Sequence, residues 1–312
     1  MKKVNLTGRH FINLEDFTSD ELSALIDYTF ELKSKLKSHE EINIMKNKTM
    51  VMYFSKPSLR TRLSFEIGMK KLGGDAFVLK QDEIILGKRE SIEDSANVIS
   101  RYCDLIMIRT FAHSDIEEFA KHSKVPVINA LTDLSHPCQI MADLFTMKEH
   151  FGKLKGLTLS YIGDGNNVCN SLLTGCSMLG VNIKAAVPKG YEPDSKTSDT
   201  AKRFAEENGS TVDIMNDVKE AVRGSDVVYT DVWASMGQES EKEERLKVFN
   251  GFTLTKELFS LAGKDAIALH CLPAHKGEEI SKEVFNMNAE YIYTEAENRM
   301  HAQMSIMSAI IK

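Results

Sequence analysis

The stretch TMVMYFSKPSLRTR, residues 49–62, decides the fold of the first half of the chain. Its first six residues are apolar, aromatic or β-branched and predict a buried strand, whereas the remaining eight form a polar turn. Apolar residues then recur at helical spacing as far as Gly73-Gly74, which predicts a helix over residues 63–72. A strand followed directly by a helix is the first half of a βαβ unit.

Short apolar runs continue to alternate with longer helical stretches through the rest of the chain. The other predicted strands cover residues 105–108, 157–162, 183–187, 227–230 and 266–269. Strands that alternate with helices in this way form parallel sheets with helices on both faces. The sequence therefore predicts an α/β protein.

The length of 312 residues exceeds the usual size of one hydrophobic core, so two domains are expected. A polar stretch at residues 150–156 precedes a new series of strands and is the candidate junction. We expect a first domain over residues 1–150 and a second over 151–295, each with a central parallel sheet flanked by helices. A C-terminal helix over 296–312 has an apolar face and is expected to pack back on the first domain.

Composition narrows the class of function. The hydrophobic content of 42% and charged content of 27% are typical of a folded globular protein and argue against disorder. The net charge is −6 and the basic residues are scattered, so binding to nucleic acid or to an acidic membrane is not expected. No apolar run approaches membrane-spanning length, and the amino terminus has no apolar signal core. The five cysteines form no CxxC pair, which favours free thiols and a cytoplasmic protein.

The polar turn before the first helix has the features of a phosphate-binding site. Ser58 and Thr61 stand where a helix begins and where unpaired backbone N–H groups suit an anion. Arg60 and Arg62 add planar guanidinium groups that match phosphate oxygens. From this segment alone, a capped helix with solvated arginines is an equally good interpretation.

A series of motifs, in order along the chain, resembles the aspartate/ornithine carbamoyltransferase family and, within it, the ornithine branch. Residues 58–62, Ser-Leu-Arg-Thr-Arg, are similar to the family's Ser-Thr-Arg-Thr-Arg carbamoyl-phosphate signature. The further motifs are Met107-Ile108-Arg109-Thr110, His136-Pro137-Cys138-Gln139, Gly163-Asp164-Gly165-Asn166-Asn167, Asp231 to Gly237, His270-Cys271-Leu272-Pro273 and Glu297-Asn298-Arg299. The resemblance covers essentially the whole chain. It implies transfer of a carbamoyl group from carbamoyl phosphate to the δ-amine of L-ornithine, giving L-citrulline and phosphate in arginine metabolism.

In the family, the first domain binds carbamoyl phosphate. Donors at the carbamoyl end stabilise oxygen charge as the tetrahedral intermediate forms, and each is typically worth roughly 3 to 4 kcal/mol. The carbamoyl-phosphate residues that the resemblance implies are Ser58, Leu59, Arg60, Thr61, Arg62, Arg109, His136, Gln139, Cys271, Leu272 and Arg299. Taken alone, a histidine before a proline is more often a structural turn residue.

In the family, the second domain binds ornithine. An alkylammonium has a pKa of about 10.4 and only its neutral form attacks, so near pH 7.5 deprotonation costs about 4 kcal/mol. By resemblance, Asp231 and Cys271 lie near the δ-nitrogen and orient it. The α-amino and α-carboxylate ends are expected to bind Asn167, Ser235 and Met236. The implied catalytic residues are Arg109, His136, Asp231 and Cys271.

Some of these residues also have plainer interpretations. Cys271 alone is typical of a small buried residue, and a nucleophilic pair with His270 is not expected because strand neighbours point to opposite faces. The histidines and cysteines match no standard zinc-ligand spacing, so we expect no metal and no cofactor. The charged run at residues 238–245 is by default a solvated loop or helix face, although in the family it is a mobile loop over ornithine.

Two other classes of function remain open. Gly163-Asp164-Gly165 follows a strand and opens a helix, as in dinucleotide-dependent oxidoreductases, but Val168 replaces the third glycine. A non-enzymatic anion-binding module would use the phosphate turn alone. Within the family, the alternatives are carbamoyltransferases that act on another amine such as putrescine, on aspartate or on an acylated ornithine.

The resemblance also implies a homotrimer with sites at subunit interfaces. Three positions depart from the family pattern. Leu59 replaces a frequent threonine, and Ala274 stands where some relatives carry arginine. Ile85 stands where several relatives carry a polar residue that reaches the phosphate of a neighbouring subunit, so that contact is not expected here.

Overall fold

The computed structural model describes residues 4–80, 86–234 and 241–312. The chain divides into two compact units. The first contains the chain up to Ala142 together with Glu297–Lys312, and the second contains Asp143–Ala296. Three residues discussed above, Ile85, Ser235 and Met236, lie outside the described residues.

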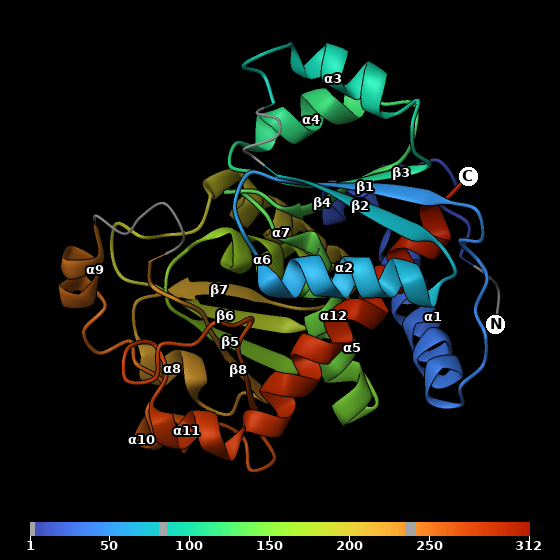
Figure 1. Ribbon diagram of the computed structural model, residues 1–312. Coiled ribbons are helices and arrows are strands. Elements are labelled where there is room, and N and C mark those ends of the chain that lie inside the picture. Colours follow the sequence, from blue (N-terminus) through green and yellow to red (C-terminus); the bar gives the residue numbers. More distant parts are fainter. Residues whose placement is uncertain (1–3, 81–85, 235–240) are drawn as a thin grey trace. The chain divides into compact units, whose positions relative to one another are not determined.

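The first unit is built on a four-stranded parallel sheet with strand order β2-β1-β3-β4. Its strands are β1 (Thr49–Phe54), β2 (Asp75–Lys80), β3 (Leu105–Arg109) and β4 (Val127–Leu131). Its helices include the short 3-10 helix η1 (Leu14–Asp16), α1 (Ser19–Lys37), α2 (Leu59–Lys71), α3 (Ile92–Ile99) and α4 (His113–His122). In Figure 1, α3 and α4 cover one face of this sheet, and α1 and α2 lie on the other.

Both faces of this sheet are buried. Every residue of β3 is buried, and Ile106 and Ile108 belong to one core cluster with Ile116 and Phe119 of α4. Successive strand residues point to opposite faces, so Met107 faces the other helical layer. This two-sided burial explains why the central strands form continuous apolar runs in the sequence.

Helix α12 (Ala289–Ile310) contributes its last turns to the first unit. The side chain of Met304 lies against Gly68 of α2, where an added Cβ atom would stand 3.2 Å from it. The hydroxyl of Ser305 donates a hydrogen bond of 2.8 Å to the carbonyl oxygen of Leu25 in α1. The prediction that the C-terminal helix packs on the first domain is confirmed.

The second unit has a five-stranded parallel sheet with strand order β7-β6-β5-β8-β9. Its strands are β5 (Thr158–Ile162), β6 (Asn182–Ala186), β7 (Val212–Met215), β8 (Val227–Thr230) and β9 (Ile267–Leu269). Its helices are α6 (Asn167–Met178), α7 (Ser195–Asn208), α8 (Val218–Val222), α9 (Lys242–Val248), α10 (Lys256–Phe259) and α11 (Lys282–Met287), with most of α5 (Pro137–Phe151).

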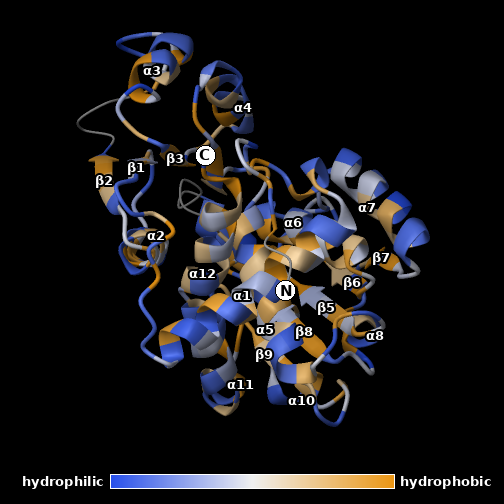
Figure 2. Ribbon diagram, turned by 90° about the vertical axis from the view of Figure 1, so that its right-hand side faces the viewer, coloured by the Kyte–Doolittle hydropathy of each residue, from blue (hydrophilic) through white to orange (hydrophobic). Residues whose placement is uncertain are grey.

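The core of the second unit also lies on both faces of its sheet. Val228 and Ala268 pack with Leu258 of α10 and with Val284 and Phe285 of α11. Helices α6 and α7 lie on the opposite face (Figure 1). Figure 2 shows that α7 carries both hydrophilic and hydrophobic residues, as expected for a helix with one buried face. Within the described residues, no helix combines the length and apolar character needed to cross a membrane.

Six strands predicted from the sequence are present to within one residue at each end, and the α/β class is confirmed. The prediction missed β2, β4 and β7. Strands β2 and β7 are sheet edges with partly exposed residues, and β4 is interrupted by the polar but buried Asn129. Helix α2 begins at Leu59 instead of residue 63, because the Ser58 side chain caps it by accepting a hydrogen bond from the Thr61 N–H.

In both sheets the strand order reverses at the first strand. Strand β1 pairs with β2 on one side and β3 on the other, and β5 pairs likewise with β6 and β8. Ligands of α/β proteins bind beyond the carboxyl ends of the strands at such a reversal. The residues there are Ser55 to Arg62 and Arg109 in the first unit, and Gly163 to Asn167 and Asp231 in the second.

Candidate active site

In the first unit, the turn between β1 and α2 has the features of an anion-binding site. Ser58 is the N-cap of α2, and its side-chain oxygen lies 3.3 Å from the backbone nitrogen and 3.0 Å from the hydroxyl of Thr61. The unpaired N–H groups of the first helical turn give this end a partial positive charge. The Leu59 side chain is 71% exposed, so this position contributes its backbone to the helix terminus.

Thr61 is the point at which three segments of the first unit meet. Its hydroxyl oxygen accepts a hydrogen bond from Nη2 of Arg299 on α12 at 2.8 Å and from Nη1 of Arg109 at the end of β3 at 3.4 Å. Both arginines are buried, so water screens their charges only weakly. This arrangement concentrates positive charge beside the helix terminus, as a bound phosphate dianion requires.

Arg62 does not join this buried group. Its Nε atom lies 3.0 Å from Oε2 of Glu66, one turn further along α2, and the Arg62 side chain is 47% exposed. Of the two arginines in the Ser-Leu-Arg-Thr-Arg motif, Arg62 is therefore engaged in a surface ion pair.

His136 and Gln139 stand at the start of α5, and both are buried. Burial lowers the pKa of His136 well below its ordinary value, and the charges of Arg299 and Arg109 lower it further. The imidazole is therefore neutral at pH 7 and adds no third positive charge. A neutral ring still donates one N–H hydrogen bond, which suits an oxygen atom with growing negative charge.

Lys56 lies within the turn between β1 and α2 but was not singled out from the sequence. Its Nζ atom is 2.6 Å from Oδ1 of Asp133 and stands 4.1 Å above the ring of Phe111. The Lys56 side chain is only 7% exposed. Lys56 thereby ties this turn to the loop that precedes His136, and a lysine among turn residues gives no sequence signal of such burial.

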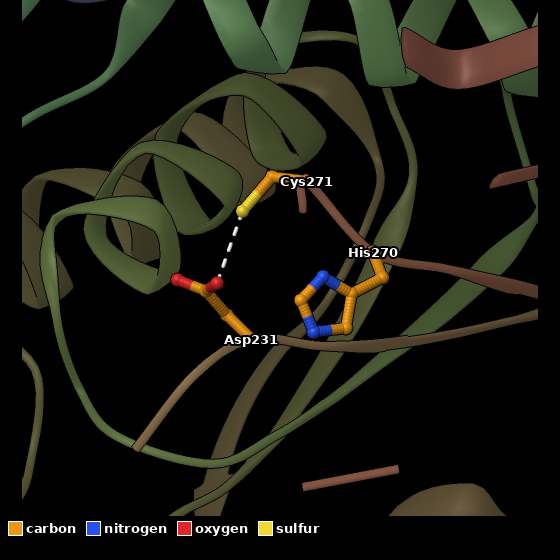
Figure 3. A group of neighbouring side chains, drawn as sticks. All are labelled: Asp231, His270 and Cys271. Atoms are coloured by element: carbon orange, nitrogen blue, oxygen red, sulfur yellow. Dashed lines mark hydrogen bonds between the residues drawn. The ribbon is translucent and has the colours of Figure 1, made fainter. Parts of the chain in front are cut away.

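In the second unit, the carboxylate of Asp231 follows β8 and is held from both sides. The Cys271 thiol donates a hydrogen bond to Oδ1 at 3.0 Å (Figure 3), and Nδ2 of Asn166 donates one to Oδ2 at 3.0 Å. Burial raises the pKa of the Cys271 thiol well above its ordinary value, and the neighbouring Asp231 carboxylate raises it further. Cys271 is therefore a protonated hydrogen-bond donor and not a thiolate nucleophile.

His270 precedes Cys271 in the chain but has its own partners. Its Nδ1 accepts a hydrogen bond from the Leu272 N–H at 2.9 Å, so its Nε2 carries the proton toward Glu279 at 3.1 Å. Asp231, His270 and Cys271 each place one potential ligand atom within 4.8 Å of the others. Because both ring nitrogens of His270 are engaged, this group is not arranged to hold a metal ion.

The backbone of Leu272 is left-handed, with φ of +60°. This conformation is unusual for a residue with a branched side chain, and such residues concentrate at functional sites. The surrounding structure therefore imposes the backbone conformation of the segment after β9.

Asn166, which was not singled out as a site residue, contacts Asp231. It precedes Asn167, the residue that the resemblance assigns to the α-groups of ornithine. Asn166 is the N-cap of α6, where its Oδ1 accepts hydrogen bonds from the N–H groups of Val168 and Cys169 at 2.9 and 3.1 Å. With Oδ1 so occupied, the amide nitrogen is left to face the carboxylate. Asn167 is the first residue of the helix. The preference of asparagine for the N-cap is the sequence signal that identifies Asn166.

Gly165 explains why Gly163-Asp164-Gly165 looks like part of a dinucleotide-binding motif. A Cβ atom at Gly165 would lie 2.3 Å from the backbone nitrogen of Pro193 and 2.5 Å from the carbonyl oxygen of Tyr191. The close approach of the protein's own backbone accounts for this glycine without a pyrophosphate. The dinucleotide interpretation thereby loses its main support.

The charged run that leads into α9 is only partly solvated. Glu241 to Glu244 are exposed, as the default interpretation required, but the Arg245 side chain is only 8% exposed. The interpretation of this run as a solvated face is therefore wrong at Arg245, and residues 238–240 lie outside the part of the chain that the structure describes.

Each sheet thus carries one set of polar residues at its strand-order reversal. The first set is cationic with a neutral imidazole, and the second presents a carboxylate held by an amide and a thiol. The first unit therefore suits an anion, and the second unit suits a cationic group such as an amine.

Comparison with known proteins identifies the family. The family model described as the carbamoyl-P binding domain of aspartate/ornithine carbamoyltransferase matches residues 9–149. The model of the Asp/Orn binding domain matches residues 155–310. The chain belongs to the aspartate/ornithine carbamoyltransferase family.

The relatives agree with this assignment. The ornithine carbamoyltransferases of Nitratiruptor sp. and Carboxydothermus hydrogenoformans are 51% and 49% identical to this chain, over 96% and 97% of it and 96% and 98% of their own lengths. The solved structure of ornithine carbamoyltransferase from Pyrococcus furiosus has a TM-score of 0.95 at 43% identity, covering 99% of this chain and 98% of that one. The resemblance inferred from the motifs is confirmed.

We expect the buried His136 to make folding less favourable in acid. The unfolded histidine takes up a proton near its ordinary pKa of 6.5, whereas the folded ring does so only at much lower pH. As the pH falls below 6.5, the unfolded state binds more protons and the free energy of unfolding decreases. In urea unfolding, His136→Gln should therefore lose less stability than the wild type between about pH 7 and about pH 5.5.

The matched control is His39→Gln, because His39 is exposed. This variant should follow the wild-type pH dependence. If His136→Gln follows it too, the ring is not held neutral by its surroundings.

Proposed function

We propose that this protein transfers the carbamoyl group of carbamoyl phosphate to the δ-amine of L-ornithine, giving L-citrulline and phosphate. The observation that carries the proposal is the Asp231 carboxylate, fixed by Cys271 and Asn166 at the end of β8 and suited to an aliphatic amine. The relatives at about half identity are named ornithine carbamoyltransferase, which favours ornithine over putrescine.

The first unit is the proposed site of carbamoyl phosphate. The N-terminus of α2 with Ser58 and Arg60 would hold the phosphate, supported by the positive charge gathered at Thr61. Arg109 and the neutral His136 would donate hydrogen bonds to the carbonyl oxygen. The proposed donor-site residues of this unit are Ser58, Leu59, Arg60, Thr61, Arg62, Arg109, His136, Gln139 and Arg299.

In the proposed reaction, the lone pair of the neutral δ-amine attacks the carbonyl carbon and forms the new C–N bond. The carbonyl oxygen of the tetrahedral intermediate bears the developing charge, and each donor aimed at it contributes roughly 3 to 4 kcal/mol. The bond from carbon to the phosphate oxygen then breaks, phosphate leaves with the electron pair, and the nitrogen passes its proton to the departing phosphate. A covalent enzyme intermediate is not needed, and the raised pKa of Cys271 disfavours one.

The second unit is the proposed site of ornithine. Its δ-ammonium would first meet Asp231, whose two oxygens are already oriented by Cys271 and Asn166. For a free alkylammonium, deprotonation near pH 7.5 costs about 4 kcal/mol. Holding the neutral amine with its lone pair aimed at the carbonyl carbon lowers the remaining barrier through proximity and orientation. Asn167, Ser235 and Met236 are the proposed partners of the α-amino and α-carboxylate groups.

A cytoplasmic location and a place in arginine metabolism form part of the proposal. All five cysteines of the chain are within the described residues, and all are free thiols. Free thiols persist in a reducing compartment, and Cys271 must remain reduced to donate its hydrogen bond to Asp231.

We further propose that the protein is a homotrimer that associates through the outer side of α2. Leu59, Leu63 and Ile67 follow one another at helical spacing and are 71%, 45% and 43% exposed. Phe77, on the neighbouring edge strand β2, is 60% exposed. Several exposed large apolar side chains on neighbouring elements are typical of a contact between protein chains.

The first experiment offers the purified protein carbamoyl phosphate with L-ornithine, putrescine, aspartate or N-acetylornithine in separate assays. We expect citrulline from ornithine and negligible product from the other three amines. Preferential turnover of another amine would overturn the assignment of ornithine. An absence of turnover with every amine would return the protein to the class of anion-binding modules.

Two substitutions should each impair the use of only one of the two substrates. Arg60→Ala should weaken carbamoyl-phosphate binding at least about tenfold in calorimetry, since a hydrogen bond to a charged group is worth about 1.5 to 3 kcal/mol. Asp231→Asn should lower kcat/KM for ornithine by a similar factor while leaving carbamoyl-phosphate binding intact. Arg101→Ala, at an exposed position of the first unit, is the control. Wild-type behaviour of either variant would remove that residue from the proposed site.

The oligomer is tested by sedimentation. The wild type should sediment with about three times the 35.0 kDa mass of one chain. The double variant Leu63→Glu, Ile67→Glu should sediment as a smaller species, because two carboxylates cannot be buried in an apolar contact without a large desolvation cost. Met287→Glu, at a position that is 57% exposed in the second unit, should leave the mass unchanged. An unchanged mass in the double variant would exclude this surface.

A further inference from the structure

Arg245 is a buried guanidinium with hydrogen-bond acceptors in three directions. Its Nη1 atom lies 2.8 Å from Oδ2 of Asp164 and 2.8 Å from the carbonyl oxygen of Trp233. Its Nε atom lies 2.9 Å from Oε2 of Glu241, one turn earlier. The ring of Tyr191 packs against the guanidinium, 5.0 Å from it. Burial of such a charge is tolerated only because these acceptors are present.

The two hydrogen-bond acceptors of Nη1 belong to the two turns that carry the proposed ornithine site. Asp164 lies in the turn between β5 and α6, two residues before Asn166. Trp233 lies two residues after Asp231, in the segment that follows β8. Asn166 and Asp231 are themselves joined by the 3.0 Å hydrogen bond between Nδ2 and Oδ2. Arg245 therefore ties together the same two turns that the Asn166–Asp231 bond joins.

We propose that Arg245 is a positioning residue that fixes the direction of the Asp231 carboxylate toward the acceptor amine by holding Asp164 and the Trp233 carbonyl together. The inference rests on the proposed function, because the amine is that of ornithine. Arg245 itself need not touch the substrate.

An arginine is required for this arrangement. The planar guanidinium presents several donors in fixed directions, whereas a lysine offers one ammonium on a flexible stem. The aromatic rings nearby restrict the peptide further. Trp233 stacks on Phe249 with ring centroids 5.5 Å apart. This contact restricts the Trp233 side chain and therefore also the position of its backbone carbonyl.

The charge of Arg245 also controls the state of Asp164. Burial raises the pKa of Asp164 to about 6, with Arg245 acting in the opposite direction and the Asp231 charge raising it. With Arg245 present, Asp164 is mainly ionised at pH 7.5. Without Arg245, the pKa of Asp164 would rise further, and a protonated Asp164 would lose its charge-assisted hydrogen bond.

The decisive experiment compares two ligands in the Arg245→Gln variant. L-ornithine carries the δ-amine that Asp231 would meet, whereas L-2-aminopentanoate has the same α-groups and chain length but no δ-amine. We expect kcat/KM for ornithine to fall by a factor on the order of 100, as for a misplacement of reacting groups by about 1 Å. The inhibition constant of L-2-aminopentanoate should change less than about twofold, since it does not depend on Asp231.

Further variants test whether Arg245 acts together with Asp164. Arg245→Lys should recover part of the activity, and Glu241→Gln should have a small effect because Glu241 is 53% exposed. Asp164→Asn combined with Arg245→Gln should lose little more than the larger single effect, because the two residues act as a unit. Arg203→Gln, on the exposed side of α7 in the same unit, is the control for removal of an arginine.

A measurement without substrate separates this inference from the proposed function. If Asp231 loses its direction, its bond to the Cys271 thiol weakens, and Cys271 should be alkylated by iodoacetamide severalfold faster in Arg245→Gln than in the wild type or Arg203→Gln. Peptide mass spectrometry distinguishes Cys271 from the other four cysteines. A faster reaction in a protein that does not carbamoylate ornithine would uphold the positioning role and reject the proposed substrate.

Two results would overturn the inference. One is equal weakening of ornithine and L-2-aminopentanoate, which would give Arg245 a purely structural role in the second unit. The other is an unchanged alkylation rate of Cys271 in Arg245→Gln.

Discussion

The reversal of strand order beside β1 and beside β5 is the constraint on which the rest of the structure depends. In each sheet the first strand of the unit pairs in parallel with its successor on one side and with a later strand on the other. In each sheet, the connections that follow the two central strands therefore run to opposite sides. Among the residues that the structure describes, no connection crosses over the carboxyl ends of these two strands. The Ser58 turn and Arg109 meet at one such point, and Asn166 and Asp231 meet at the other.

The two units present opposite charges at these strand-order reversals. In the first unit, buried Arg109 and Arg299 converge on a neutral hydroxyl, and burial beside them keeps His136 neutral. A neutral His136 therefore adds no charge that would repel the two buried arginines. In the second unit, burial keeps the Cys271 thiol protonated, so Asp231 is oriented by neutral donors. The same physical effect, the desolvation of an ionisable group, gives both units their chemistry.

The sequence predicted secondary structure correctly where local sequence preferences and the pattern of burial indicate the same element. Strand β1, the turn and α2 were predictable because an apolar run, a capping serine and helical spacing are adjacent in the chain. Strand β4 was missed because the buried Asn129 looks like a surface residue until its partners, which lie far away in the sequence, are known. Lys56 was missed for the same reason, whereas the preference of asparagine for the N-cap could have identified Asn166. The resemblance supplied residues by position in a motif, and it could not show that Arg62 turns toward Glu66 or that Arg245 is buried.

The placement of Arg245 follows from the demands of an amine substrate. Asp164 and Asp231 are two buried carboxylates near enough for the charge of one to raise the pKa of the other, so one cation nearby lowers the cost of burying them. The arginine is bound to Asp164, whereas the hydrogen-bond partners of Asp231 among the described residues are an amide and a thiol. A cation bound directly to Asp231 would compete with the substrate amine. Neutralising the neighbouring carboxylate instead relieves the repulsion and leaves Asp231 available, so that the same residue that stabilises the buried charge also fixes its direction.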